Sequence, residues 1–506
     1  MVNQTVSNSS YQNALIIGGG AAGLATALML AKRSWKNITV LEKRPTADYY
    51  EPDKSYNYAI DGRGQKFTDY LEITDKLLEI SVPSTEFYLT LIKADGSRKT
   101  SKLPIVDPNR KTTYWLPRQE FISLLYQEIQ ANWHDSIEVL FNVKSCDINK
   151  INESHAESKE QEKLEISVYK DDNSVTKFQP SLLVGCDGIN SGVRNTLKQW
   201  DEAVLNKSVS NESITTKYQL HYYPSPSSLL RYKVLTLPAS FPLDLDGKEK
   251  LVCNMAYAIR GSFKERQRAI SLGLLPIKNP DSPRTANIIT RPGHEIWNLK
   301  TGNEIYSFFE QAFPHLPVRQ IISSEEAEKF AKSEGGQFPI PQYCSGLYYL
   351  LNQEQSNTGI VLLGDAIHCF PPDIGQGVNS ALEDVCVLQS ALSQSNDNIS
   401  QALPLYESLR SKDLKPLIRL AQTAFPWQYN QAPLSRRLWS VNFFLRLLLS
   451  RVLPFIFSPP AFFLIQNHRL SYQEIWVKAQ RTTKILYALG IILICCFFAI
   501  YFVYNV

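Results

Sequence analysis

A glycine-rich turn near the start of the chain has the residue types and spacing that bind dinucleotide phosphates. In ALIIGGGAAGLATALMLAK, Gly18, Gly20 and Gly23 form a GxGxxG pattern between a predicted strand and a predicted helix. The first glycine permits a tight turn, the second lets a pyrophosphate approach the backbone, and the third lets helix and strand pack closely. Glu42 ends the next predicted strand, 19 residues after Gly23, where an acid accepts ribose hydroxyls. The pattern predicts FAD or NAD(P) as the ligand.

Two further motifs follow predicted strands of their own. LLVGCDGINSGVR places Asp187 and Gly188 at the end of a strand predicted over 182–187. VLLGDAIHCFPPDIGQGVNSALED ends a strand at Asp365 and then enters a proline-stiffened, glycine-rich loop before a helix predicted from about Gly377. A helix N-terminus in this position can sit against a ring that develops negative charge. The residues of this loop that could approach a ligand are Pro372, Gly375, Gln376 and Gly377.

The three motifs, in order and spacing, resemble those of the single-component FAD-dependent aromatic hydroxylases, or class A flavoprotein monooxygenases, which include p-hydroxybenzoate hydroxylase. Shorter segments, YAIDGRGQKF, YWLPRQEF and RLSYQEIWVKAQR, look like segments of the kynurenine 3-monooxygenases. The resemblance implies an α/β fold with an FAD-binding, Rossmann-like domain and an interleaved, mostly-β substrate domain. It also implies that NADH or NADPH reduces FAD, and that a flavin hydroperoxide then transfers one oxygen atom from O2 to an electron-rich substrate.

The same resemblance assigns residues to the adenosine half of FAD. The three glycines of the first motif would hold the pyrophosphate, and Glu42 the ribose. Arg118, in YWLPRQEF, would contact the pyrophosphate or ribose side; the alternative is a surface arginine on a helix. Arg63, in YAIDGRGQKF, is a weaker cofactor candidate, and a structural turn explains it equally well.

The flavin half is assigned in the same way. Asp187 and Gly188 are implicated in binding both FAD and NAD(P)H, and Asp365 would hydrogen-bond the ribityl chain. The loop from Pro372 to Gly377 would contact the isoalloxazine ring. His368 lies inside this motif and is interpreted as anchoring the loop rather than acting as a base. No catalytic acid or base is assigned, and no metal is expected because the seven histidines show no ligand spacing.

The resemblance breaks down where kynurenine 3-monooxygenases hold their amino-acid substrate. Their Arg, two Tyr and Asn fall near four apolar residues here, which are Leu89, Ile105, Ala461 and Ala424. A carboxylate in a pocket without a cation or donors is strongly destabilised, so we expect a less polar substrate, aromatic or otherwise electron-rich. Alternatives are an FAD-dependent epoxidase of a lipophilic alkene and a non-enzymatic, membrane-tethered flavoprotein.

The elements that must position these residues divide the chain into predicted units. Residues 13–200 and 351–395 are expected to form the FAD-binding domain, and 201–350 the mostly-β substrate domain. Residues 396–484 should form a helical C-terminal region, and residues 1–12 a disordered N-terminus. Predicted helices include 116–130 and 398–420, and a charged loop is expected over 151–163.

The C-terminal residues 485–504 are uncharged and almost wholly apolar, and as a helix they would span about 30 Å, one bilayer core. Lys478, Arg481 and Lys484 precede them, so the positive-inside rule predicts a single-pass tail anchor with the catalytic part facing the cytoplasm. A second apolar stretch, 438–465, is expected to lie against the membrane surface, to close the active-site cavity, or to pack as an ordinary helical layer.

Composition narrows the partners further. The 506 residues carry 53 basic and 49 acidic side chains, a net charge of +4, which makes no case for nucleic acid. The eight cysteines include no CxxC pair, which disfavours a zinc ribbon. A small-molecule substrate and a membrane are therefore the expected partners, and the oligomeric state stays open.

Overall fold

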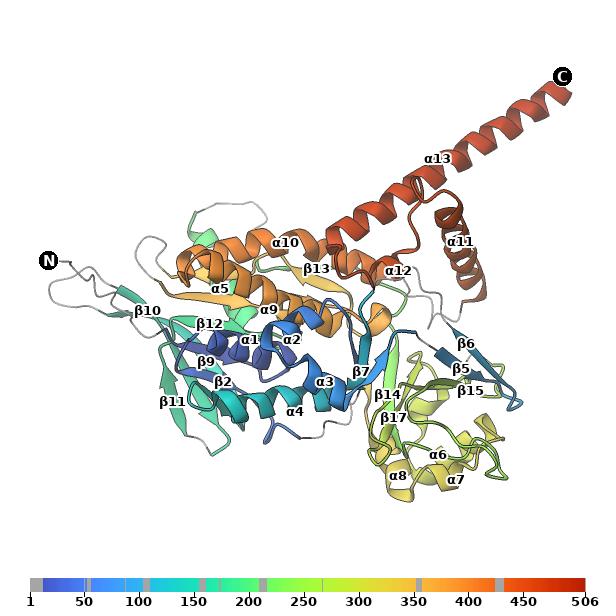
Figure 1. The fold of residues 1–506 in the computed structure, drawn as a ribbon, viewed down its shortest axis with the longest axis horizontal. Helices are drawn as coiled ribbons and strands as arrows, with labels where there is room; N and C mark the ends of the chain where they lie inside the picture. The colour runs from blue at the N-terminus through green and yellow to red at the C-terminus, as the bar shows by residue number, and fades with distance from the viewer. Residues whose placement is uncertain are drawn as a thin grey trace.

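The computed structural model describes residues 12–505, except 50, 52–55, 87, 103–109, 154–160, 173, 209–215, 266, 352–356 and 424–431. The predicted disordered N-terminus lies outside the described residues apart from Gln12, whose side chain donates a 2.9 Å hydrogen bond to the Asp397 carbonyl. The described residues form a mixed α/β fold from which one long helix projects (Figure 1).

Parallel strands form the centre of a six-stranded sheet with the order β20-β21-β12-β1-β2-β8. The strands are β20 (Tyr348–Leu350), β21 (Gly359–Leu362), β12 (Leu182–Gly185), β1 (Ala14–Ile17), β2 (Ile38–Leu41) and β8 (Ile137–Leu140). All neighbouring pairs are parallel except β20 with β21. The central strands are buried apolar runs, as expected for a covered parallel sheet. The residues that follow β1, β12 and β21 therefore lie at one edge of the sheet.

Helix α1 (Ala21–Lys32) packs beside this sheet, and α9 (Gly377–Gln394) and α4 (Arg118–Glu128) both pack against α1. α1 is apolar on nearly every face because it is buried between the sheet and both other helices. The helix predicted over 116–130 begins later than expected, since Leu116 and Pro117 end strand β7 (Thr113–Pro117). Other helices of this half are α2 (Gln65–Leu71), α3 (Thr74–Ile80), α5 (Gly192–Ser208) and α10 (Ile399–Thr423).

A second, seven-stranded sheet has the order β18-β14-β17-β16-β15-β5-β6. Its strands are β18 (Gly336–Gln337), β14 (Arg231–Leu237), β17 (Arg284–Thr290), β16 (Ser271–Leu274), β15 (Ala256–Arg260), β5 (Tyr88–Ile92) and β6 (Arg98–Lys102). Residues of the β5–β6 hairpin fall within the segment 13–200 that is expected to form the FAD-binding domain, but β5 pairs in parallel with β15 and the hairpin extends this second sheet. The segment 201–350 is also not mostly β, since it carries α6 (Gly302–Ala312), α7 (Val318–Ile321) and α8 (Ser324–Lys332), whose buried apolar sides join the same core.

Three small antiparallel sheets complete the strands. They are β9 (Val143–Glu153), β10 (Gln161–Lys170) and β11 (Val175–Phe178); β13 (Leu220–Tyr222), β19 (Gln342–Cys344) and β22 (His368–Cys369); and β3 (Asn57–Ile60), β7 and β4 (Val82–Ser84). The charged loop predicted over 151–163 is shorter than expected because β9 and β10 extend into it, and 154–160 lie outside the described residues.

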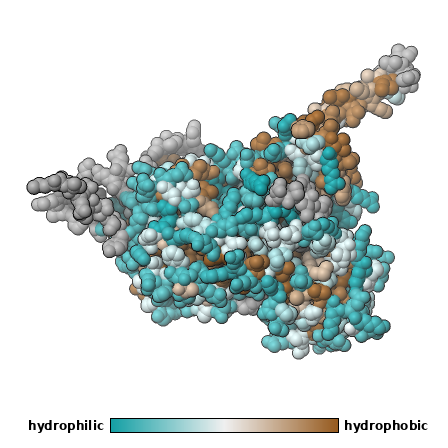
Figure 2. Space-filling view, viewed as in Figure 1, coloured by the Kyte–Doolittle hydropathy of each residue, from teal (hydrophilic) through white to brown (hydrophobic). Residues whose placement is uncertain are grey.

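The C-terminal region consists of α11 (Pro433–Val452), α12 (Ala461–Leu464) and α13 (Tyr472–Asn505). α13 has 34 residues and is about 51 Å long. Its first turns are buried at Tyr472 and Ile475, whereas its later part carries exposed apolar side chains and projects from the body (Figures 1 and 2). Residues Tyr472–Tyr501 are long and apolar enough to cross a membrane.

Candidate cofactor-binding site

The turns that follow β1, β12 and β21 meet closely at the edge of the parallel sheet. Gly18 has a φ of +108°, and a Cβ on it would lie 2.3 Å from the Cys186 carbonyl oxygen, so only glycine fits between the first two turns. Gly364 has a φ of +63°, and a Cβ there would lie 3.2 Å from the Cβ of Ala22 in α1. The three sequence motifs are thus adjacent in space.

The other two glycines of the first motif differ sharply in their surroundings. A Cβ on Gly23 would lie 1.9 Å from the Gly18 carbonyl oxygen, so this glycine permits the close contact of α1 with the turn. A Cβ on Gly20 would meet no atom within 4 Å, because Gly20 caps α1 and faces open space. The N-terminal N–H groups of α1 beside it favour an anionic group.

Glu42 is buried at the end of β2 and is already hydrogen-bonded by the protein. Its carboxylate accepts the Gly19 N–H at 2.8 Å and the Arg44 N–H at 2.9 Å. The Arg44 guanidinium forms an ion pair with it at 3.1 Å and donates to the Gly19 carbonyl at 2.8 Å. One terminal nitrogen of Arg44 has no protein partner although it is buried. Sequence reasoning missed Arg44, whose only signal was its position two residues after the acid.

Asp187 and Gly188 form the turn after β12. One Asp187 carboxylate oxygen accepts the Val193 N–H at 3.1 Å, and the other is buried without a protein partner. Gly188 has a φ of +83°, and a Cβ on it would meet nothing within 4 Å. Arg194 ties this turn to the third motif by donating to the Ala366 carbonyl at 2.7 Å. An unsatisfied buried acceptor beside open backbone fits a bound polar group.

Asp365 lies in a short 3-10 turn, Gly364–Ala366, just after β21. Its side chain is accessible to solvent, yet surrounding protein raises the pKa of its carboxyl, while His368 and, less strongly, Arg118 partly oppose this shift. Arg118 begins α4, is mostly buried, lies 3.5 Å from Glu51 and is close to the hydroxyl of Tyr58. It is not the surface arginine of the alternative interpretation.

The glycine loop of the third motif alternates between open and buried residues. Pro372, Gly375 and Gly377 are exposed, and neither glycine would meet an atom within 4 Å through an added Cβ. Gln376 is buried instead: its amide donates to Asp61 at 2.7 Å, and its carbonyl oxygen accepts the Tyr472 hydroxyl at 2.8 Å. The Gln376 side chain thus braces the loop from behind, and the loop backbone is what a ring could approach.

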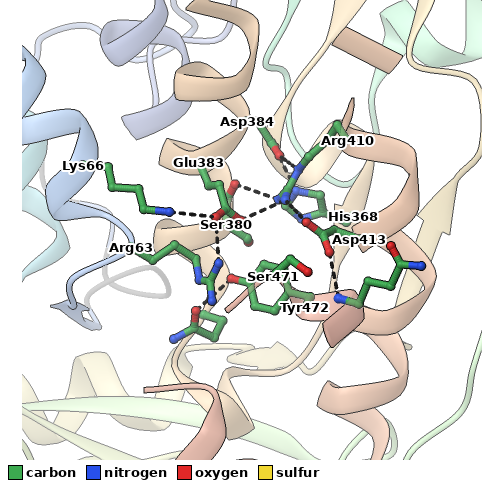
Figure 3. A network of polar contacts seen from close by, with 12 residues as sticks. Arg63, Lys66, His368, Ser380, Glu383, Asp384, Arg410, Asp413, Ser471 and Tyr472 are labelled. Atoms are coloured by element: carbon green, nitrogen blue, oxygen red, sulfur yellow. Dashed lines mark hydrogen bonds and ion pairs between the residues drawn. The ribbon is translucent and has the colours of Figure 1, made fainter. Parts of the chain in front are cut away.

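Arg63 lies in a buried ion network, with its guanidinium engaged by protein groups (Figure 3). It pairs with Glu383 at 2.7 Å, donates to the Leu470 carbonyl at 2.8 Å and lies over the Tyr472 ring at 4.1 Å. Arg410 of α10 pairs with the other Glu383 oxygen at 2.9 Å. Of the two interpretations of Arg63, the geometry favours the structural one.

The same network fixes the start of the third motif. Asp384 of α9 accepts the Gly364 N–H at 2.8 Å and contacts His368 Nε2 at 2.8 Å and Arg410 Nε at 2.6 Å. Burial disfavours its ionised form, but His368 and Arg410 outweigh that effect and lower the pKa of Asp384. His368 is buried and held by this contact, as predicted for a loop anchor. Glu383, Asp384, Arg410 and Tyr472 were not identified from the sequence.

Asp373 is a second residue of the loop that sequence reasoning missed. It is 3% exposed, and neither carboxylate oxygen has a protein hydrogen bond of normal geometry. Burial raises the pKa of its carboxyl to about 7, although the nearby Ser227 hydroxyl partly opposes the shift.

The four positions expected to contact substrate are only partly described. Leu89 lies in β5 opposite Ala256, and Ala461 is the first residue of α12. Ile105 and Ala424 lie outside the described residues.

Comparisons with known proteins agree with this geometry. Residues 13–50 match a family model described as FAD dependent oxidoreductase, and residues 350–414 one described as FAD binding domain. The chain is 24% identical over 413 residues to the kynurenine 3-monooxygenase of Candida albicans, covering 80% of this chain and 78% of that one. It is 22% identical to the kynurenine 3-monooxygenase of Caenorhabditis elegans, covering 93% of each chain.

Solved structures share the fold at low sequence identity. PqsL of Pseudomonas aeruginosa in complex with 2-aminobenzoylacetate superposes with a TM-score of 0.52 at 18% identity, over 85% of this chain and 99% of that one. The tetrameric form of 2-methyl-3-hydroxypyridine-5-carboxylic acid oxygenase gives a TM-score of 0.53 at 14% identity, over 87% of this chain and 96% of that one. These solved structures show a shared fold. The family-model matches and the curated relatives show that the chain is similar to FAD-dependent monooxygenases of the kynurenine 3-monooxygenase type.

Proposed function

We propose that this monooxygenase uses NADH or NADPH and O2 to add one oxygen atom to an aromatic or other electron-rich, weakly polar substrate. In balance, the substrate gains one oxygen atom, the nicotinamide is oxidised, and the second oxygen atom leaves as water. The observation that carries the proposal is the convergence of three turns, after β1, β12 and β21, around open backbone at Gly20, Gly188 and Gly377.

FAD fits the donors and acceptors of this site. The α1 N-terminus at Gly20 would hold the pyrophosphate, and Glu42 would take the ribose, with the unpaired Arg44 nitrogen close to it. Asp365 and the free Asp187 oxygen are acceptors for hydroxyl groups. Gly375 and Gly377 leave space for a ring against the loop. When bound, FAD would supply the redox chemistry by passing electrons from the nicotinamide to O2.

The protein's own contribution is to hold the cofactor, to orient the substrate against it and to keep water out of the site. The buried network of Arg63, Glu383, Asp384 and Arg410 stiffens the loop that faces the ring, so the loop backbone keeps its position during turnover. Enclosure by the seven-stranded sheet and the C-terminal helices would limit water, which favours oxygen transfer over release of hydrogen peroxide.

The weakly polar substrate is inferred from the residues at two described positions. Leu89 and Ala461 stand near the positions where kynurenine 3-monooxygenases carry an Arg and a Tyr, and neither can pair with a carboxylate. The apolar part of α13 would anchor the enzyme as a tail, with Lys478, Arg481 and Lys484 on the cytoplasmic side. Lipophilic substrates would then be concentrated next to the site.

Oxidation of NADH and NADPH by the detergent-solubilised, FAD-loaded protein tests this function. Oxygen uptake and product mass are followed with L-kynurenine, with lipophilic phenols and indoles, and with a lipophilic alkene. We expect phenols or indoles to stimulate turnover and to gain one oxygen atom. Efficient hydroxylation of kynurenine would refute the proposal of a weakly polar substrate. Formation of an epoxide from the alkene would show that the reaction is epoxidation and not hydroxylation.

A further inference from the structure

Helix α11 carries a continuous stripe of exposed apolar side chains. Its members recur at alternating steps of four and three residues, which places them on one side of a helix. They are Leu434, Leu438, Val441, Leu445, Leu448 and Val452. The opposite side faces the protein, where Phe443 packs on Phe463 with ring centroids 5.5 Å apart and Leu447 is buried. α11 therefore has an apolar side for the body and a second one without a partner among the described residues.

Contacts between α11 and α13 fix the position of this stripe relative to the start of the apolar run of α13. Arg446, in the second half of α11, donates to the Ala479 carbonyl at 3.3 Å and to the Thr483 hydroxyl at 2.9 Å. Thr483 comes two residues before Ile485, where the uncharged run of α13 begins. The second half of α11, around Arg446, thus lies where α13 would enter a bilayer. In Figure 2 the apolar surface of α13 continues onto the adjoining C-terminal helices.

The charges around the stripe are those of a surface facing anionic headgroups. Between 433 and 484 there are eight lysines and arginines, and Glu474 is the only acid. Arg437 and Arg451 are exposed at the edge of the stripe, one near each end of α11. Long basic side chains in such positions reach headgroup phosphates while their stems lie along apolar surface. Phe455, 93% exposed, extends the apolar surface just beyond α11.

We propose that α11 and the turn at Phe455 form a second membrane contact, lying in the plane of an anionic lipid surface beside the α13 span. This inference rests on the proposed tail anchor, because α13 sets the level of α11. Two contacts, one spanning and one in the plane, would fix how the enzyme body is tilted over the membrane. A second copy of the chain is the other occupant that such a stripe could accept; the basic flanks and the adjacent span favour lipid.

The test uses the full-length, FAD-loaded protein in vesicles of phosphatidylcholine and phosphatidylserine. An environment-sensitive fluorescent amino acid replaces Val441 in one variant and Leu245 in another. Leu245 is a matched control, since it is 65% exposed against 66% for Val441 but lies in a loop of the enzyme body. Lipids brominated along their acyl chains should quench the reporter at 441 and leave the one at 245 unchanged. Resistance of the protein to alkaline extraction is measured in parallel and reports on the α13 span.

In a double variant, Leu438→Glu with Leu445→Glu, the equilibrium constant for binding of α11 to lipid should fall roughly 100-fold or more. The quenching of the reporter at 441 should then be abolished. The control pair Leu78→Glu with Leu245→Glu, on exposed body positions, should leave it unchanged. An unquenched 441 reporter in protein that resists extraction would overturn the α11 contact and leave the anchor intact. Extractable protein would overturn the anchor instead. Cross-links between α11 helices, with no quenching by lipid, would assign the stripe to a second copy.

Discussion

Asp373 gives a stability prediction whose size follows from its surroundings. The carboxyl is buried, lacks a protein hydrogen bond of normal geometry, and has its pKa raised from 3.8 to about 7. A carboxyl with a raised folded-state pKa stabilises the protein fully below its unfolded pKa and progressively less as pH rises to the folded pKa. At about 1.4 kcal/mol per pKa unit, ionising Asp373 in the folded protein costs about 4 kcal/mol above pH 7.

Asp373→Asn removes this cost while keeping a side chain of the same shape that can donate a hydrogen bond, as the protonated acid can. The variant should gain stability over the parent as pH rises, and the difference should grow by about 3 kcal/mol between pH 5 and pH 8.5. Urea denaturation in detergent with excess FAD, followed by tryptophan fluorescence at several pH values, measures the difference. Asp246→Asn, on an exposed loop, is the control and should show no such trend.

A stability difference that stays constant between pH 5 and pH 8.5 would refute the reasoning. It would mean that Asp373 is not buried as an acid, or that a donor stabilises its ionised form. The same experiment without excess FAD separates these two results. If only the FAD-loaded protein lacks the trend, the cofactor or an ordered group beside it supplies the missing donor.

Three further predictions concern the site and its supports. Gly23→Ala should lower the free energy of unfolding by roughly 3 kcal/mol, because the added Cβ would clash with Gly18. Gly20→Ala should weaken FAD binding roughly tenfold without changing the free energy of unfolding of the FAD-free protein. Denaturation measures the first effect and FAD titration the second. Arg410→Met should lower the free energy of unfolding, measured by denaturation, by about 3–5 kcal/mol, because the buried carboxylates of Glu383 and Asp384 each lose one charged partner. A variant as stable as the wild type would show that this network does not stabilise the fold. Tyr472→Phe should cost about 1 kcal/mol and weaken FAD binding through the loss of the bond to Gln376, and unchanged FAD affinity would show that this bond does not support the loop.

The motifs at strand ends were predictable because their chemistry is local. The stretch from Ala14 to Glu42 is one strand, one turn, one helix and one strand, and the strands and the helix each have their own hydrophobic periodicity. The helix after Gly377 and the anchoring role of His368 could be predicted from the third motif for the same reason. Their contacts then follow from the parallel order of the sheet.

The supporting residues were not predictable because their partners are distant in the chain. Arg63 meets Glu383 of α9 and Tyr472 of α13 only once both helices reach its turn in the folded protein. The pairing of Leu89 with Ala256 is of the same kind, since a strand pattern does not name its parallel partner. Arg44 and Asp373 lie next to recognised motifs, but their burial depends on tertiary packing that spacing does not encode.

The continuity of α13 decides how this enzyme can be shortened. Its first turns belong to the enzyme core, since Tyr472 and Ile475 pack with residues of α10 and Thr482 accepts a bond from the Ser458 N–H at 2.9 Å. A chain that ends at Lys484 would lose the apolar run and keep these contacts. A chain that ends before Tyr472 would open the wall behind the cofactor loop. Removing the spanning segment from an intact enzyme therefore depends on cutting within a single helix, in the few residues between Thr482 and Ile485, and the exposed stripe of α11 would remain on the shortened protein.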